Sequence, residues 1–360
     1  MSRMFGQSGR RPPNEVRTKS VFRSPEVRPP FPQPAKRTRA RGVIPMNSGI
    51  QPHLGLWTFA GMAFGFLAGR VFPGLILQPF IPVALFVMLF PAMLGIELHK
   101  IRQAMINPKL LVISQFLNFI VAPVLIFLIS RILSLHISRG QSIGAIIFAL
   151  IPCGGMVPAY TSMVNGNVNL AVCIVAFSLI LSIGIVPLWL ELLAGESIRT
   201  PIWLVAQFLA ACIILPIVAA WLLRKYIVAK RGPGAYGALK KSLKNLSVYG
   251  LIFMVFIIFA SNGKLFSRQP WAIVKIVAAA LLFFVGQITC SMLLAKAARA
   301  SCSDSVALVI SSTARNTALA MALAVSYFGP ETSLFIAVAG PLVQLPGMLV
   351  FLKVAGFMLK

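Results

Sequence analysis

Acidic residues are scarce in this chain, which has 7 Asp and Glu against 33 Lys and Arg over 360 residues. Only 3 histidines occur, and they stand far apart at His53, His99 and His136. Acid/base catalysis needs titratable groups held close together, and a catalytic triad needs a histidine beside its nucleophile. No such constellation is visible, so the sequence predicts a protein that is not an enzyme.

Cysteine is also sparse and dispersed. The 5 cysteines form neither a C-x-x-C pair nor a Cys/His pattern, which argues against a disulfide framework and against a zinc site. We therefore expect neither a metal nor a cofactor. The cysteines lie in apolar segments, at Cys153, Cys173, Cys212, Cys290 and Cys302.

Apolar residues are in excess, since 58% of the chain is hydrophobic and only 11% is charged. This composition is typical of an all-α, multi-pass membrane protein. A membrane-crossing helix takes about 20 residues, so the chain has room for roughly ten spans. The ten apolar runs lie at about 54–71, 75–98, 110–134, 141–164, 168–193, 201–223, 245–263, 270–295, 304–328 and 332–357.

The first 48 residues differ from the rest because they are rich in Arg, Pro and Ser and show no apolar period. Such a composition predicts a disordered basic tail, followed by a ten-helix domain over 49–360. Three interpretations stay open: a cytoplasmic tail that meets anionic lipid headgroups, an organellar transit peptide, or a true start at Met46.

Positive charge is unevenly distributed between the loops. Loops after even-numbered spans carry most of the Lys and Arg, including seven between Arg224 and Lys244. The positive-inside rule then places both termini in the cytoplasm, with the plasma or inner membrane as the expected location, or an organellar envelope if a transit peptide is present. Because the net charge of +26 is concentrated at membrane edges, we expect the lipid bilayer rather than nucleic acid as its partner.

The longest internal loop, RKYIVAKRGPGAYGALKKS at 224–242, divides the spans five and five. Five is an odd number, so the two halves, at about 53–195 and 200–360, enter the membrane with opposite orientations. Inverted repeats of this kind are typical of secondary transporters, in which broken helices at matching places form the substrate site.

The fourth span contains the stretch IPCGGMVPAYTSMVNGN from Ile151 to Asn167, which is rich in helix breakers. Pro152 and Pro158 cannot donate backbone hydrogen bonds, and Gly154 and Gly155 tolerate unwound backbone. Freed backbone groups are tolerable in a bilayer only beside protein or a wet cavity. The stretch therefore predicts a discontinuous helix beside a cavity. A proline kink that only shapes packing is the alternative.

The ninth span matches the fourth in position and reads SSTARNTALAMALAV from Ser311 to Val325. Arg315 lies in its middle, where a charge costs roughly 2.5–3.5 kcal/mol on insertion scales unless it meets a cavity or a partner. We expect no carboxylate at the depth of Arg315, so a bound anion would supply the counter-charge for its guanidinium. Backbone carbonyls, Gln287 or Gln344 are the alternative partners.

From about residue 53 onward, the chain resembles the bile acid:sodium symporter superfamily, including its arsenite permease branch. The resemblance rests on NPKLLVISQFLNFIVAPVLIF from Asn107, on PCGGMV followed by Gly166 and Asn167, on ARNTALAMALAVSYFG, and on PLVQLPGMLV. It implies a panel domain and a core domain, with discontinuous fourth and ninth helices that cross in the core, and transport by alternating access.

Two departures bear on ion coupling. The resemblance implies a ninth-span E-x-x-x-Q-N pattern that binds sodium, but this chain has Ser311 in place of the Glu and Arg315 in place of the Gln, and keeps only the Asn, as Asn316. The permease branch carries acids at positions that match Ala318 and Gln344 here. We therefore expect altered coupling to Na⁺ or H⁺, with Arg315 as a fixed charge in place of the cation.

The function predicted from these observations is secondary transport of a small organic anion, bile-acid-like or a carboxylate. Arsenite or antimonite efflux through Cys153 is the alternative, because thiolates bind such soft species, although a buried cysteine also serves as an apolar filler. A non-transporting membrane sensor is a second alternative. The predicted substrate-binding residues are Arg315, Asn316, Cys153, Gly154, Gly155, Thr313 and Asn118, and the weaker ion-binding candidates are Ser311, Ser312 and Gln344.

Overall fold

A computed structural model describes residues 54–72, 77–94, 108–132, 138–194, 202–268 and 270–358. Among these residues, the structure is built from helices and contains no β-strand, only one isolated β-bridge. The predicted tail at 1–48 lies outside the described residues. The helices are α1 Leu54–Val71, α2 Ile81–Leu94, α4 Pro108–Phe116, α5 Ala122–Ile132, α6 Arg139–Leu150, α7 Val157–Met163, α8 Val168–Ala194, α9 Ile202–Arg268, α10 Pro270–Ala297, α11 Cys302–Thr313, α12 Thr317–Tyr327, α13 Pro330–Val338 and α14 Leu345–Met358.

Three short elements complete the described part of the chain: a 3₁₀ turn, η2 Gln78–Phe80, and two π-helical turns, η3 Leu117–Val121 and η6 Ala339–Gln344. The π-turns join α4 to α5 and α13 to α14, so each pair runs as one long span. Such turns widen the helix and free backbone groups, and they occur often at functional sites.

Five helical segments within the described residues are long and apolar enough to cross a membrane. This finding confirms the predicted all-α membrane protein, whereas the count of ten spans and the inverted repeat stay predictions. Three shorter apolar helices also occur, at Leu56–Val71, Val248–Lys264 and Thr317–Tyr327. The five long segments are Pro108–Ile132, Val168–Leu193, Ile202–Leu239, Pro270–Ala297 and Pro330–Ala355.

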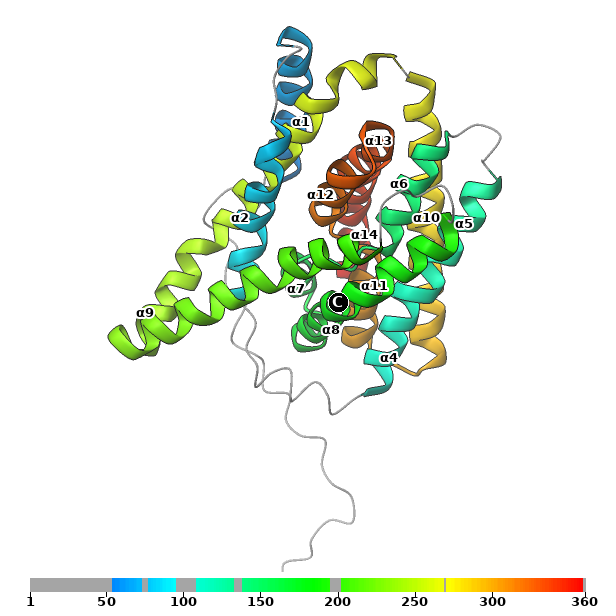
Figure 1. Cartoon of the computed structure of the whole chain (residues 1–360). Coiled ribbons are helices and arrows are strands. Elements are labelled where there is room, and N and C mark those ends of the chain that lie inside the picture. Colours follow the sequence, from blue (N-terminus) through cyan, green and yellow to red (C-terminus); the bar gives the residue numbers. More distant parts are fainter. Residues whose placement is uncertain are drawn as a thin grey trace, which may run out of the picture. The chain divides into compact units, whose positions relative to one another are not determined.

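Helices α1 and α2 pack along α9, as Figure 1 shows. The close approach of α1 follows from its sequence, in which Gly61, Gly65 and Gly69 recur every four residues on one face. A Cβ atom at Gly65 or Gly69 would collide with backbone carbonyls of α9, at Phe256 and Ala260. Small residues at this spacing let membrane helices come into backbone contact.

The region 224–242 was expected to be a loop, and this expectation is wrong. Helix α9 runs from Ile202 to Arg268, and only Gly232, with φ 77°, has non-helical backbone. Glycine reaches this left-handed region without a steric penalty, and Pro233 then starts the second arm in a position where proline fits well. The surrounding Ala, Lys, Arg and Leu are good helix formers, so both arms extend up to this single residue.

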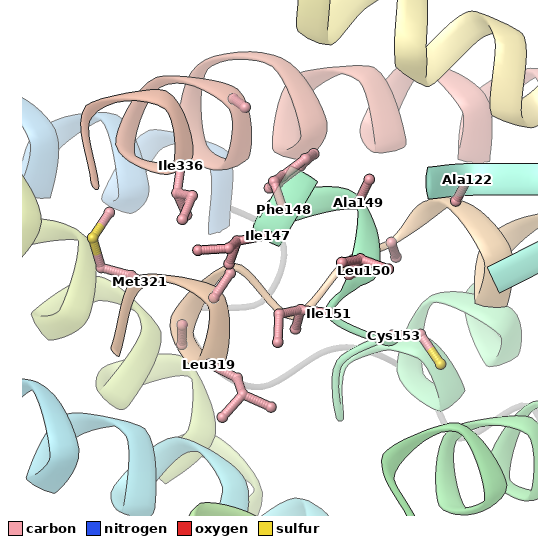
Figure 2. Packing of buried hydrophobic residues seen from close by; sticks show 14 of the residues in the cluster. Ala122, Ile147, Phe148, Ala149, Leu150, Ile151, Cys153, Leu319, Met321 and Ile336 are labelled. Carbon is pink, nitrogen blue, oxygen red and sulfur yellow. The ribbon is translucent and has the colours of Figure 1, made fainter. Parts of the chain in front are cut away.

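The two predicted helix interruptions are present. Helix α6 ends at Leu150, and α7 begins at Val157 with a proline in its first turn. Helix α11 ends at Thr313, and α12 begins at Thr317. Figure 2 shows the apolar packing around them, with Leu319 and Met321 of α12 and Ile147 and Ile151 at the end of α6 drawn as sticks.

Candidate functional site

The two helix interruptions meet each other and form an antiparallel β-bridge between Cys153 and Arg315. The backbone N–H of Gly154 donates to the carbonyl of Ala314 at 3.2 Å, and the N–H of Asn316 donates to the carbonyl of Pro152 at 3.0 Å. Each break thus satisfies backbone groups that the other leaves free. This pairing is needed because a bilayer interior offers no water to bond free backbone N–H and C=O groups. We call this pairing of residues 152–154 with 314–316 the crossing.

The side chains of Cys153 and Arg315 lie on the same face of the crossing. These two residues form the pair that exchanges no hydrogen bond of its own, and in such pairs the side chains stand close together on one face. Both side chains are buried, with 0% of Cys153 and 2% of Arg315 exposed. In Figure 2 the sulfur of Cys153 points away from Ile151.

The Arg315 guanidinium is only partly satisfied. Its Nη1 donates to Oδ1 of Asn118 at 3.1 Å, and its carbon lies 5.8 Å from the ring centre of Phe283. Its Nε and Nη2 are buried without a hydrogen-bond partner, and no carboxylate pairs with it among the residues that the structure describes. An uncompensated cation in a low-dielectric interior costs several kcal/mol. The site therefore has an excess of positive charge.

A chain of polar side chains continues from Arg315 into α4 and α8. Asn118 donates to Ser178 at 3.4 Å, Ser178 donates to Gln115 at 2.9 Å, and Gln115 donates to Ser114 at 3.0 Å. All the members of this chain are neutral, so they orient the guanidinium without cancelling its charge.

Gln344, on the π-turn η6, binds the backbone of Arg315 rather than its guanidinium. Its Oε1 accepts from the Arg315 N–H at 2.9 Å, and its Nε2 donates to the Arg315 carbonyl at 2.9 Å. Both polar atoms of this amide are thus engaged. Gln287, the other expected partner, donates instead to the carbonyl of Leu117 at 3.0 Å. Asn118 is the side chain to which the guanidinium donates a hydrogen bond.

The remaining candidates of the ninth span occupy distinct positions. Asn316 caps α12, because its Oδ1 accepts from the N–H of Leu319 at 3.2 Å, while its Nδ2 is buried without a partner. Ser312 shares a hydrogen bond with Ser291 at 2.6 Å, and the Thr313 hydroxyl donates to the carbonyl of Val309 at 2.7 Å. The Ser311 hydroxyl is buried and also lacks a partner among the described residues.

A cavity of about 60 Å³ lies against the crossing. The polar side chains of its lining come from the two interruptions and η6, and we call this part the polar wall, whereas the lining residues from α2 and the second arm of α9 are all apolar, and we call them the apolar wall. Of the predicted site residues, five line the cavity, namely Gly154, Gly155, Arg315, Asn316 and Gln344. The apolar wall consists of Met88, Leu251, Met254, Val255 and Ile258.

The other predicted site residues are not among those that line the cavity. Asn118 lies in the buried polar chain, Cys153 is buried within the crossing itself, and Ser311, Ser312 and Thr313 lie in the last turn of α11. The apolar wall was not anticipated from sequence, because residues such as Met254 and Ile258 resemble ordinary packing residues. Only contact with a second, distant segment distinguishes them.

A family model matches residues 82–269, which is just over half of the chain, and it describes the sodium bile acid symporter family. The chain belongs to this family. As a member of the sodium bile acid symporter family it is an integral membrane transporter and not an enzyme, in agreement with the sequence-based expectation and with the apolar helices.

Three relatives align over most of their length. The arsenical-resistance protein Acr3 of Corynebacterium glutamicum is 24% identical over 86% of this chain and 89% of the relative. The protein of the same name from Alkaliphilus metalliredigens is 24% identical over 87% of this chain and 95% of the relative. An uncharacterized transporter of Synechocystis sp. is 24% identical over 89% of this chain and 91% of the relative.

Proposed function

We propose that this chain is a secondary transporter of a small organic anion, with a carboxylate as the chemical class. One observation carries the proposal: the buried Arg315 guanidinium has two unsatisfied N–H groups and no described carboxylate partner, and Arg315 is one of the residues that line the cavity. A fixed positive charge in a low-dielectric site attracts anions much more strongly than it would in water.

The cavity has the polarity that an amphipathic anion needs. The unpartnered Nδ2 of Asn316 supplies a donor on the polar wall, and the N-terminus of α12 adds partial positive charge there. The apolar wall offers side chains such as Met254 and Ile258 to the rest of the solute. We therefore assign the anionic group to the side of the crossing and the apolar group to the side of α9.

The volume of the cavity favours a small solute. One water molecule needs about 10–15 Å³ of such space, so the cavity holds on the order of five waters. A short carboxylate fits these dimensions, whereas a steroid skeleton does not fit without opening of the walls. Of the two classes expected from the sequence, we favour the small carboxylate over a bile-acid-like solute.

For the mechanism, we propose alternating access in which the crossing moves relative to the apolar wall. This mechanism uses the helix arrangement expected from the sequence, which is ten spans in two inverted halves that form panel and core groups. Both termini lie in the cytoplasm, and the protein lies in the plasma or inner membrane. We also propose that transport needs no sodium, because Arg315 provides a permanent positive charge beside the cavity.

The test is uptake by purified full-length protein in liposomes, with pyruvate, pantothenate, taurocholate and arsenite as separate probes, each with and without sodium. We expect uptake of a small carboxylate that is independent of sodium and is lost in Arg315→Gln. Gln207→Ala, an exposed change on α9, is the matched control and should keep full activity. Uptake that requires sodium, or that survives in Arg315→Gln, contradicts the proposal.

Arsenite transport is the second candidate, because two of the relatives are named as arsenical-resistance proteins. Cys153 is the residue this alternative depends on, yet it is fully buried within the crossing and is not among the cavity-lining residues. Arsenite uptake that is lost in Cys153→Ala and kept in Arg315→Gln would establish this alternative. Family membership favours either kind of transport over a sensor.

A further inference from the structure

The bend of α9 concentrates basic and aromatic side chains. We call residues 221–236 the elbow. Lys225, Lys230 and Arg231 are exposed there, and Arg224 is half-buried. Three more lysines follow in the sequence before residue 245, and no acidic residue occurs anywhere between Glu196 and Asp304. The elbow is therefore a surface of one charge sign, and Figure 1 shows the two arms of α9 diverging from it.

Two exposed tryptophans on the first arm of α9 indicate how the elbow lies relative to the bilayer. Trp203 and Trp221 are 59% and 52% exposed and stand at the two ends of the apolar segment. Their spacing of 18 residues corresponds to about 27 Å along a helix, close to the hydrocarbon thickness of about 30 Å. Tryptophan prefers the membrane interface, so the basic residues after Trp221 fall at headgroup level.

Three of the cations at the elbow rest on aromatic rings, and among the described residues no hydrogen bond occupies their donors. The Lys225 ammonium lies 5.4 Å from the ring centre of Trp221, and the Lys230 ammonium lies 4.7 Å from that of Tyr226. Across the bend, the Arg224 guanidinium lies 5.5 Å from the ring centre of Tyr236. These contacts order the long side chains at an exposed site, so less entropy is lost when an anion binds.

We propose that the elbow binds the phosphate groups of anionic phospholipids in the membrane leaflet that it faces. The charge selects an anion, the aromatic rings place it at headgroup depth, and the exposed Trp221 and Leu222 offer acyl chains an apolar surface. Free phosphate lacks the acyl chains and gains nothing from that surface. This site is separate from the cavity and does not depend on the proposed substrate.

The elbow connects to the cavity through the structure. The hydroxyl of Tyr236 donates to the carbonyl of Leu94 at 2.7 Å, at the end of α2, and so ties the elbow to this helix. Helix α2 and the second arm of α9 carry the apolar wall of the cavity, including Met88 and Met254. A lipid bound at the elbow thus contacts the end of the helix pair that forms this wall.

The experiment measures lipid enrichment beside Trp221. Full-length protein with phenylalanine at the other four tryptophans is placed in phosphatidylcholine nanodiscs that contain spin-labelled phosphatidylglycerol or spin-labelled phosphatidylcholine at the same mole fraction. We expect Trp221 fluorescence to report at least about threefold enrichment of the phosphatidylglycerol probe, because several basic residues act together. The enrichment should fall in high salt.

The triple variant K225Q/K230Q/R231Q should abolish the enrichment. The matched control R70Q/R131Q/K264Q removes the same number of exposed charges from the predicted opposite membrane face and should leave it intact. Soluble glycerol phosphate should not compete. Equal quenching by both probes, enrichment that persists in the elbow variant, or competition by glycerol phosphate would each overturn the proposal. If the tryptophan replacements unfold the protein, thermal stabilisation by added phosphatidylglycerol is compared between wild type and both triple variants.

Discussion

The two helix interruptions differ in what causes them. The first, between Leu150 and Val157, contains a proline and two glycines, so its own residues disfavour a continuous helix. The second, between Thr313 and Thr317, contains neither residue type and would be helical by propensity alone. Its backbone groups are bonded from elsewhere, by Pro152 and Gly154 of the first break and by Gln344 on the backbone of Arg315. A break in a membrane helix can thus be encoded locally or imposed by tertiary contacts.

At the second break, different residues fix the backbone and supply the charge. Asn316 and Gln344 hold the backbone in place, whereas the guanidinium of Arg315 contributes charge and stays incompletely satisfied. Substitutions at this break should therefore divide into those that lower stability and those that lower transport.

Arg315→Gln tests the charge and should have the largest effect. We expect transport of the anion to fall at least about 100-fold, while thermal stability stays equal or rises, because a buried cation without a counter-charge is removed. Uptake assays and thermal unfolding of the same preparation measure the two effects. A large loss of stability would show that the charge, and not the Gln344 amide, holds the break open.

Gln344→Ala tests the tertiary contact. Two buried backbone groups of Arg315 lose their side-chain partner, so we expect a loss of about 1–3 kcal/mol in the free energy of unfolding. Denaturant unfolding in detergent measures it, with the exposed Gln207→Ala change as the control, which should stay within about 0.5 kcal/mol of wild type. Equal stability of the two variants would mean that the second break is locally encoded after all.

Gly340→Ala tests the fit of η6 against the second break. A Cβ at Gly340 would collide with the side chain of Thr317, the first residue of α12. We expect a loss of about 1–3 kcal/mol from overpacking. The double variant with Thr317→Ala should recover part of this loss, since the two residues are in contact. Additive losses would contradict direct crowding.

Asn316→Ala tests the helix cap. The N–H of Leu319 loses its acceptor, and loss of such a cap costs about 1 kcal/mol. Asn316→Asp keeps the acceptor and should restore stability, whereas it places a carboxylate at the cavity and should lower transport of an anion. An aspartate variant that transports normally would remove Asn316 from the proposed site.

Gly154→Ala tests the first break and should have the smallest effect. The nearest atom to a Cβ there is the Cα of Asn316 at 3.6 Å, which is ordinary contact, and Gly154 does not have positive φ. We expect a change within about 0.5 kcal/mol. Gly144→Ala is the contrast, because its Cβ would overlap the carbonyl of Thr332 and should destabilise clearly. If both variants lose equal stability, the first break depends on glycine in a way that its geometry does not indicate.

Helix positions and both interruptions could be predicted from the sequence, because apolar runs, prolines and a central arginine are local features. The prediction of a loop at 224–242 was wrong because the glycine and proline there make the backbone non-helical at only one residue, Gly232, and the segments on both sides form helix. The glycines of the first break were expected to tolerate an unwound backbone, and Gly154 and Gly155 lie in a non-helical segment without adopting positive φ.

The sequence by itself determined that this is a helical membrane protein with two polar interruptions and an arginine in the middle of an apolar span, since hydrophobicity and backbone chemistry act locally. Only the tertiary structure decided what those residues meet. Arg315 contacts Asn118, 197 positions away in the chain, and the apolar wall of the cavity comes from α2 and α9. Such contacts depend on how helices pack against one another, and a pattern along one segment does not carry that information.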